Sequence, residues 1–363
     1  MMVSFISFVI VIGICVIVHE YGHYITARLL GVQVHEFAFG MGPVLKQIQQ
    51  NTTKENASQD EPNVSAGPRM LWSWRLFPVG GFCRLAGMGE ESDGETVVPG
   101  MGFNEQRAWK RFFILLNGSL SNVVLALILT AAFLYGHGVL NMNDTKIGTL
   151  MEGFPAQQAG FHEGDRILEV NGKPVSEWRE MSNSLREAAR LGDVVFTVER
   201  DSRVVKIETS IPDSKEHGYP MLGITPGLER YTALGAAQNA AGYIWDMTVL
   251  MLRGIWDWIT QKQEVDVTGP IGIASMSGRA MREGVWSFVT FLALISLNLG
   301  LLNLFPFPAL DGGRIVFVLL EMLLRRRLPE KVENWIHTTG FVLLISLMLF
   351  VTWQDIYKLF WGE

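Results

Sequence analysis

The 363-residue sequence has few cysteines and few charged residues, and each shortage excludes a class of protein. Its two cysteines, Cys15 and Cys83, are too few for a disulfide framework, and Cys15 lies inside an apolar run. We therefore interpret both as unpaired, small apolar residues. Charged residues make up only 18% of the chain, which is low for a soluble domain, and the net charge is −6. No block of Lys and Arg lies on a predicted soluble face, so nothing indicates a nucleic-acid partner.

The apolar residues are gathered into four runs that are long enough to cross a lipid bilayer. These runs cover residues 1–18 with a helical continuation to Leu30, 112–139, 285–310, and 338–354 with its apolar neighbours. A signal peptide is the alternative interpretation of the first run, but the run has no basic start and no small-residue cleavage site. The sequence therefore predicts a polytopic α-helical membrane protein with about four transmembrane helices.

The basic residues between these runs predict the orientation of the chain in the membrane. Those that flank the runs are Arg107, Lys110 and Arg111 before the second run, and Arg314, Arg325, Arg326, Arg327 and Lys331 between the third and fourth. No basic residue precedes the first run, and only Lys358 follows the fourth. We therefore expect both basic segments in the cytosol, and both termini and the segment 141–284 outside.

Two glycine-rich stretches follow the first run. The segments VQVHEFAFGMGPVLKQI and LWSWRLFPVGGFCRLAG alternate β-forming residues with glycines, which predicts short hairpin-like strands near the membrane face. A polar insert at 49–67 separates them. With the first two spans they form an N-terminal membrane part, 1–140, and the last two spans form a C-terminal membrane part, 285–363.

The outer segment between these parts has two characters. Residues 141–230 predict a strand, a short helix, a strand, a turn, a helix and two further strands, which together form a compact α+β domain. Residues 231–284 mix Trp245, Trp256 and Trp258 with spaced charges, which predicts amphipathic linker helices. These helices lie either in the membrane interface or against the outer domain.

The first run ends in the motif HEYGH, which combines groups that are expensive at membrane depth. His19 and His23 are four residues apart, so on a helix they share one face and can bind one Zn²⁺. Glu20 lies beside them, where it can accept a proton from a metal-bound water. The alternative is a pair of helical histidines satisfied by backbone or lipid headgroups, but that leaves the glutamate unexplained.

A catalytic zinc needs a third protein ligand, and Asp311 in NLFPFPALDGGR is the best candidate. It follows a long uncharged run, where a bare carboxylate is costly and a metal ion removes that cost. Pro306 and Pro308 break the helix, and Gly312 and Gly313 free the backbone so that the carboxylate can swing towards another helix. The alternative is an aspartate that only marks the cytosolic end of the third span.

These motifs together resemble the bacterial site-2 proteases, intramembrane zinc metalloproteases, in their subgroup with one PDZ domain in the outer loop. HEYGH and NLFPFPALDGG resemble the two metal motifs, FAFGMG the membrane-associated β-hairpin, and GPIGIA the approach to the third span. PAQQAGFHEGDRILEVNGKPV resembles part of a PDZ domain. The resemblance implies Zn²⁺ as cofactor and a bacterial plasma membrane location, with the active site towards the cytosol.

The resemblance also implies a role for each site residue. His19, His23 and Asp311 are the expected zinc ligands and Glu20 the general base, while Asn298 and Asn303 fall where the family keeps asparagines near the substrate. An amide there can instead pair with a neighbouring helix.

The expected substrates are single-pass membrane proteins, such as anti-sigma factors, or signal-peptide remnants. A peptide bond inside a membrane helix is hydrogen-bonded internally, so the substrate must unwind and be held extended. The strand-like pieces 37–42, which include Phe39 and Gly40, and 75–85 are expected to offer an edge for it. Two other functions compete with this one: an inactive membrane-tethered PDZ scaffold, and a membrane zincin that cuts substrates on the cytosolic side.

Overall fold

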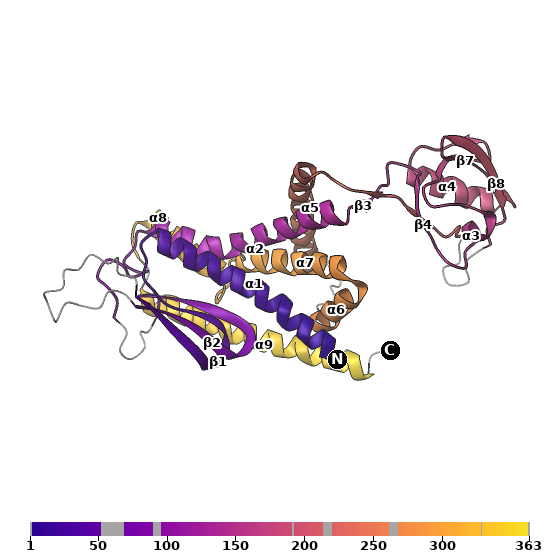
Figure 1. Cartoon of the computed structure of the whole chain (residues 1–363). Helices are drawn as coiled ribbons and strands as arrows, with labels where there is room; N and C mark the ends of the chain where they lie inside the picture. The colour runs from indigo at the N-terminus through magenta and orange to yellow at the C-terminus, as the bar shows by residue number, and fades with distance from the viewer. Residues whose placement is uncertain are drawn as a thin grey trace. The chain divides into compact units, whose positions relative to one another are not determined.

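The computed structural model describes residues 2–51, 69–89, 96–190, 192–212, 220–260, 268–327 and 329–361. Most of the polar insert at 49–67 lies outside the described residues. The chain forms two compact units, one made of Met1–Ala131 with Ala237–Glu363 and the other of Ala132–Ala236 (Figure 1).

Among the described residues, four helices of the first unit are long and apolar enough to cross a membrane. They are α1 (Met2–Leu29), α2 (Ala108–Gly136), α7 (Val285–Asn303) and α9 (Glu330–Trp361). The expected number of spans agrees with these four candidates, but the expected end of the third span is wrong. Helix α7 ends at Asn303 instead of Leu310, because Pro306 and Pro308 follow and the chain turns before α8 (Asp311–Leu324) begins.

Glycines allow the helices of this unit to pack closely, which suits a protein without a hydrophobic driving force between helices. A Cβ on Gly22 of α1 would lie 2.3 Å from the Asn117 carbonyl oxygen of α2. A Cβ on Gly278 of α6 (Pro270–Glu283) would lie 2.7 Å from Ser4 Cα of α1. Helix α1 is therefore in close contact with α2 and α6, and it also contacts α7 (Figure 1).

A carboxylate from α9 caps the N-terminus of α6. Asp355 accepts hydrogen bonds from the backbone N–H groups of Gly269 (3.1 Å) and Gly272 (2.9 Å). Negative charge at a helix N-terminus satisfies unpaired N–H groups and interacts well with the helix dipole. The glycine at the start of the GPIGIA stretch is explained by this cap, because a Cβ on Gly269 would lie 2.7 Å from Asp355 Oδ2.

The two strands after α1 are longer than expected, and each folds back so that it pairs with the other twice. Strand β1 (Val34–Asn51) pairs with β2 (Arg69–Leu85), and the register contains several irregularities. Phe37 pairs with Cys83 on one side and with Trp72 on the other. Four backbone segments therefore lie side by side in the order 81–85, 34–39, 71–74 and 44–51.

This arrangement corrects one expectation from the sequence. Phe37, Ala38 and Phe39 offer no free strand edge, because each is paired on both sides. The bend that allows this lies at Gly40, whose φ of +87° favours glycine and whose Cβ would lie 2.5 Å from the Phe77 carbonyl oxygen. The outer segments of the sheet are 81–85 and 44–51, so only the second predicted piece, 75–85, contains an edge.

A buried carboxylate ties the segments of this sheet together. Glu36 accepts hydrogen bonds from Ser73 (2.5 Å), Arg75 (2.6 Å) and Arg84 (3.1 Å). Burial by itself would raise the pKa of the Glu36 carboxyl, but the hydrogen bonds from Ser73 and Arg75 and the two guanidinium charges lower it below its usual value.

The second unit contains the elements that the sequence predicts for the outer domain, in the predicted order. They are β4 (Ile147–Leu150), α3 (Pro155–Ala159), β5 (Arg166–Val170), β6 (Lys173–Pro174), α4 (Trp178–Ala189), β7 (Val194–Arg200) and β8 (Arg203–Thr209). Four of the strands form a sheet in the order β6-β5-β7-β8. Strand β9 (Ile224–Pro226) pairs with β4, and β10 (Leu228–Glu229) pairs with β3 (Val139–Leu140).

One ion pair closes the turn before β5. Arg200 donates to both carboxylate oxygens of Asp165, at 2.8 and 2.7 Å, and the His162 N–H donates at 2.9 Å. Burial by itself would raise the pKa of the Asp165 carboxyl, but these hydrogen bonds lower it below its usual value.

Helices α5 (Ala233–Ile259) and α6 occupy the segment in which linker helices are expected. Trp245 and Trp256 of α5 are exposed, while the side chain of Trp258 lies outside the described residues. From Ala237 on, both helices belong to the first unit, and α6 contacts α1, α7 and α9, so the structure does not support the alternative in which these helices pack against the outer domain.

We expect Asp355→Ala to lower the free energy of unfolding of the detergent-solubilised protein by about 1 kcal/mol, because α6 loses its capping carboxylate. Asp355→Asn keeps one acceptor oxygen and should lose less. Thermal unfolding of both variants beside the wild type measures this, and an unchanged midpoint for Asp355→Ala would contradict the capping role.

Candidate metal centre

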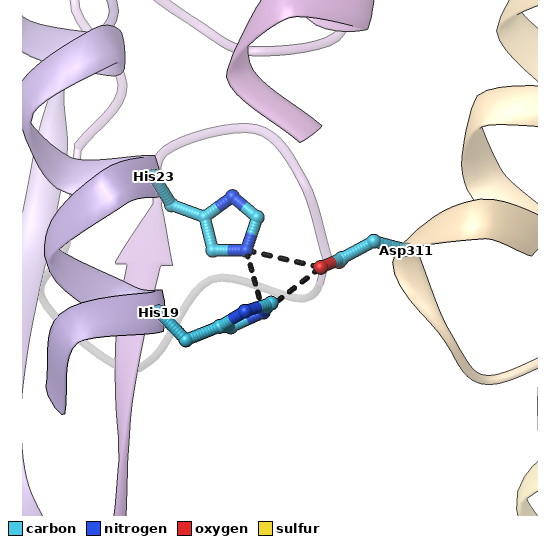
Figure 2. A group of neighbouring side chains, drawn as sticks. All are labelled: His19, His23 and Asp311. Atoms are coloured by element: carbon cyan, nitrogen blue, oxygen red, sulfur yellow. Dashed lines mark hydrogen bonds and ion pairs between the residues drawn. The ribbon is translucent and has the colours of Figure 1, made fainter. Parts of the chain in front are cut away.

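Three potential metal ligands converge where α1 meets the start of α8. His19 and His23 lie one turn apart on α1 and are 6% and 8% exposed, and Asp311 is the first residue of α8. His19 Nε2 lies 2.9 Å and His23 Nε2 3.2 Å from Asp311 Oδ2, and the two Nε2 atoms lie 3.2 Å apart. Figure 2 shows the three side chains pointing toward one another.

This triangle of donor atoms fits a zinc ion. Tetrahedral zinc with bonds of about 2.0–2.1 Å holds its ligand atoms roughly 3.3 Å apart, close to the three distances observed here. Asp311 Oδ2 is buried and within ion-pair distance of both rings, yet it accepts no well-aligned hydrogen bond from any described residue. A buried carboxylate oxygen of this kind needs a cation, and two imidazoles with one carboxylate are a typical donor set for catalytic zinc.

Helix α2 orients the second histidine. His23 Nδ1 lies 2.9 Å from the Ile114 carbonyl oxygen, which can only accept a hydrogen bond. Nδ1 therefore carries the proton, and the lone pair of Nε2 is free to bind metal. Gly118 leaves room for the ring, since a Cβ there would lie 2.3 Å from His23 Nε2.

The chain before Asp311 folds tightly against the first turn of α8. A Cβ on Gly312 would lie 2.1 Å from the Phe305 carbonyl oxygen, and one on Gly313 would lie 2.4 Å from the Phe307 carbonyl oxygen. The expectation that these glycines free the backbone is wrong, because both lie within the helix and serve close packing instead. Asp311 is accordingly held by the turn and does not swing from the end of the third span.

Glu20 lies beside the ligands in a cavity of about 330 Å³. Its Oε2 accepts a hydrogen bond of 2.9 Å from the Cys83 N–H of the outer sheet segment 81–85. Zinc, when bound, acts as a Lewis acid that makes water a nucleophile near neutral pH. The Glu20 carboxylate is placed to accept a proton at its other oxygen and to pass it to a leaving amine.

Of the four residues expected to bind substrate, only Asn303 lies at the metal centre. The Asn303 amide nitrogen lies 3.5 Å from His19 Nδ1 and 3.4 Å from its Nε2, so it contacts the ring. Asn298 is exposed and does not line the cavity. Phe39 stacks on Trp74 at 5.5 Å inside the sheet, and neither it nor Gly40 lines the cavity. The roles expected for Asn298, Phe39 and Gly40 therefore have no support from the geometry.

Two residues of the site do not follow from the two metal motifs alone. Arg314 lines the cavity one turn after Asp311 on α8. Gly118 touches His23 across the helix interface, and its presence among small residues of the second span is the only sequence signal for this contact.

Two imidazoles and a carboxylate beside a glutamate, in a chain with four candidate spans, define a metal-dependent hydrolase of the membrane. The sequence model of peptidase family M50 matches residues 7–58 and 63–347. The chain belongs to this family, the site-2 proteases, and is a membrane zinc metalloprotease.

Relatives with this activity in their names match nearly the whole chain. Proteins named "Putative zinc metalloprotease" from Fusobacterium nucleatum and Rickettsia conorii are 31% and 32% identical. The first match covers 98% of this chain and 99% of the relative, and the second covers 99% and 100%. A crystal structure of the PDZ domain of a SdrC-like protein from Listeria monocytogenes matches 24% of this chain and 92% of its own at 18% identity, with a TM-score of 0.21. A TM-score of this size does not establish a shared fold.

We expect Glu20→Gln to reduce peptide cleavage by at least roughly a hundredfold while zinc stays bound, because the amide cannot accept the proton. Its oxygen can still accept the Cys83 hydrogen bond, so the local structure should be kept. Zinc content and cleavage of a single-span reporter measure the two effects, with Tyr21→Phe, an exposed neighbour, as control. Cleavage near the wild-type rate would remove Glu20 from the proton transfer.

We expect Gly118→Ala to weaken zinc binding at least roughly tenfold, because the added methyl group occupies the place of the His23 ring. Gly242→Ala is the matched control, since Gly242 is also helical but no atom lies within 4 Å of a Cβ there. Competition with a zinc chelator measures both variants. Equal affinities would show that the close approach of Gly118 does not determine the position of the His23 ring.

Proposed function

We propose that this protease cleaves single-pass membrane proteins, such as anti-sigma factors, or signal-peptide remnants within the membrane, as the second cut of regulated intramembrane proteolysis. The observation that carries the proposal is the position of His19 and His23 on α1, a helix long and apolar enough to cross the bilayer. A peptide bond that reaches these residues comes from a segment inside or at the edge of the membrane.

Such a substrate must lose its helical hydrogen bonds before its carbonyl can react. The sheet segment 81–85 offers a support for the unwound chain, because only its inner side is paired within the described sheet. The Cys83 N–H points away from the paired side of this segment and towards Glu20. In an antiparallel strand, the N–H and C=O groups of one residue point to the same edge of the strand. The Cys83 carbonyl therefore faces outward, where an extended substrate could donate a hydrogen bond to it.

The structure also supports the proposed orientation. Glu321 of α8 pairs with Arg111 at the start of α2 and with Arg327, at 3.2 Å. The two basic segments are therefore adjacent, which agrees with a common cytosolic location. The proposed location is the bacterial plasma membrane, with both termini and the second unit outside and the zinc towards the cytosol.

We propose further that the second unit is a PDZ domain that limits access to substrates with a small or already trimmed outer part. A hollow of about 210 Å³ lies between α4 and the chain around Leu222 and Gly223. The described residues of this unit contain no group of metal ligands, so exclusion of large substrates fits it better than chemistry.

The two competing functions are less well supported. Membership of a protease family with the metal and base residues in place argues against an inactive scaffold. A zincin that cuts cytosolic proteins would not need its histidines on a candidate span.

We expect cleavage to depend on the helix stability of the substrate's span rather than on its hydropathy. Interior Gly destabilises a helix by roughly 1 kcal/mol and Pro by roughly 3 kcal/mol relative to Ala, so both lower the work of exposing a carbonyl. A poly-Leu span should be cut poorly, and Gly, Pro or Asn in its cytosolic third should restore cleavage.

The assay is a series of reporters with equal hydropathy and different helix propensity, cut by the purified enzyme in detergent. Glu20→Gln is the inactive control. Equal rates across the series would show that the enzyme unwinds any helix unaided, and the edge at 81–85 would lose its proposed role.

We expect a cysteine at Val204, which is 66% exposed on β8, to react with a membrane-impermeant thiol reagent from outside the cell. Asn171 is unsuitable for this label, because its side chain accepts a hydrogen bond from Val195 N–H and its φ is +51°. Arg326→Cys is the control for the cytosolic side. Both native cysteines are replaced by alanine, and labelling of Val204→Cys only after lysis would reverse the proposed topology.

A further inference from the structure

The turn that delivers Asp311 contains a residue in an unfavourable backbone conformation. Ala309, two residues before Asp311, has a φ of +77°. This left-handed region is disfavoured for residues with a Cβ, so the surroundings must hold Ala309 there. Leu310 is the N-cap of α8, and its carbonyl oxygen accepts a hydrogen bond from Gly313 N–H at 3.1 Å. The conformation of Ala309 thus sets the direction in which α8 and its first side chain leave the turn.

A histidine from the last helix holds this residue. The Ala309 N–H donates a hydrogen bond of 3.1 Å to Nδ1 of His337 on α9. Because Nδ1 accepts, the proton of the neutral ring is on Nε2, which lies 4.0 Å from Glu333 Oε1. The ring also packs edge-on against Phe317 of α8, with centroids 5.4 Å apart. The imidazole therefore bridges the turn and the helix that begins with Asp311.

The backbone of α9 comes unusually close to the same turn. Gly340 lies almost one helical turn after His337, on the same side of α9. A Cβ on Gly340 would lie 2.7 Å from the Pro308 carbonyl oxygen. The His337 hydrogen bond therefore belongs to a close contact between α9 and the residues 308–309.

We propose that His337 is a positioning residue of the zinc centre, which holds Ala309 in its left-handed conformation and thereby presents the Asp311 carboxylate to His19 and His23. His337 is not among the residues that line the zinc cavity; it lines a neighbouring hollow, which shares Met88, Gly89, Leu115 and Arg314 with that cavity. It acts through one backbone hydrogen bond. The inference depends on Asp311 as a zinc ligand but not on the identity of the substrate.

The test measures zinc affinity of the full-length protein in detergent by competition with a chromophoric chelator. His337→Asn places its Oδ1 near the position of Nδ1 and can accept the Ala309 N–H, whereas His337→Gln carries its acceptor one bond farther, near the position of Nε2. We expect His337→Ala and His337→Gln to bind zinc roughly tenfold more weakly, the effect of one lost buried hydrogen bond. His337→Asn should stay near the wild type, as should Thr338→Ala, an exposed neighbour on α9.

A second pair of variants separates positioning from general stability. Glycine adopts a φ of +77° without the Cβ penalty, so Ala309→Gly should need less support. We expect His337→Ala to lower zinc affinity less in the Ala309→Gly background than in the wild type, as a double-mutant cycle reveals. The proposal would be overturned if His337→Ala lowered zinc affinity equally in both backgrounds. It would also be overturned if His337→Gln bound zinc like the wild type, or if His337→Asn and His337→Gln lost equal zinc affinity. The Asn and Gln pair keeps the test valid if His337→Ala does not fold.

Discussion

The structure depends on bringing one carboxylate oxygen within 2.9 and 3.2 Å of two imidazole nitrogens in the interior of a membrane protein. Three electron-rich atoms at these distances repel one another unless a cation lies between them, and zinc supplies that charge. The two histidines come from one turn of α1 and need only helical periodicity. Asp311 comes from almost three hundred residues later, so the rest of the fold must deliver it.

Several close contacts deliver these ligands. Gly118 and the Ile114 carbonyl of α2 fix the position and the protonated nitrogen of His23. Gly312 and Gly313 let the preceding carbonyls pack against α8, and His337 holds the strained residue Ala309. Each contact brings a backbone group close to a ring or to another backbone group, so small residues recur around the centre. The positions of the metal ligands are therefore determined by the packing around them as well as by the ligands themselves.

The sequence predicts those parts of the molecule that depend on local pattern. Four apolar runs, HEYGH and the isolated carboxylate of Asp311 are sufficient to predict the four candidate spans, although not the end of the third, and the three side chains that converge in the structure. The sequence predicts the strands of the sheet but not their order, because strand pairing is a non-local property. Phe39 and Gly40 carry the same β-like pattern as an edge strand, yet the fold-back at Gly40 places them between two paired segments. Contacts such as that of His337 with Ala309 depend on tertiary packing, so no local sequence pattern predicts them.

X-ray absorption at the zinc K-edge of the purified, zinc-loaded protein tests the central claim most directly. We expect a four-coordinate shell of nitrogen and oxygen at about 2.0–2.1 Å, with scattering from two imidazoles and no sulfur. Asp311→Asn should alter the first shell and lower the zinc content. A sulfur ligand at about 2.3 Å would contradict the account, because it would assign the metal to a cysteine such as Cys83, which lines the same cavity.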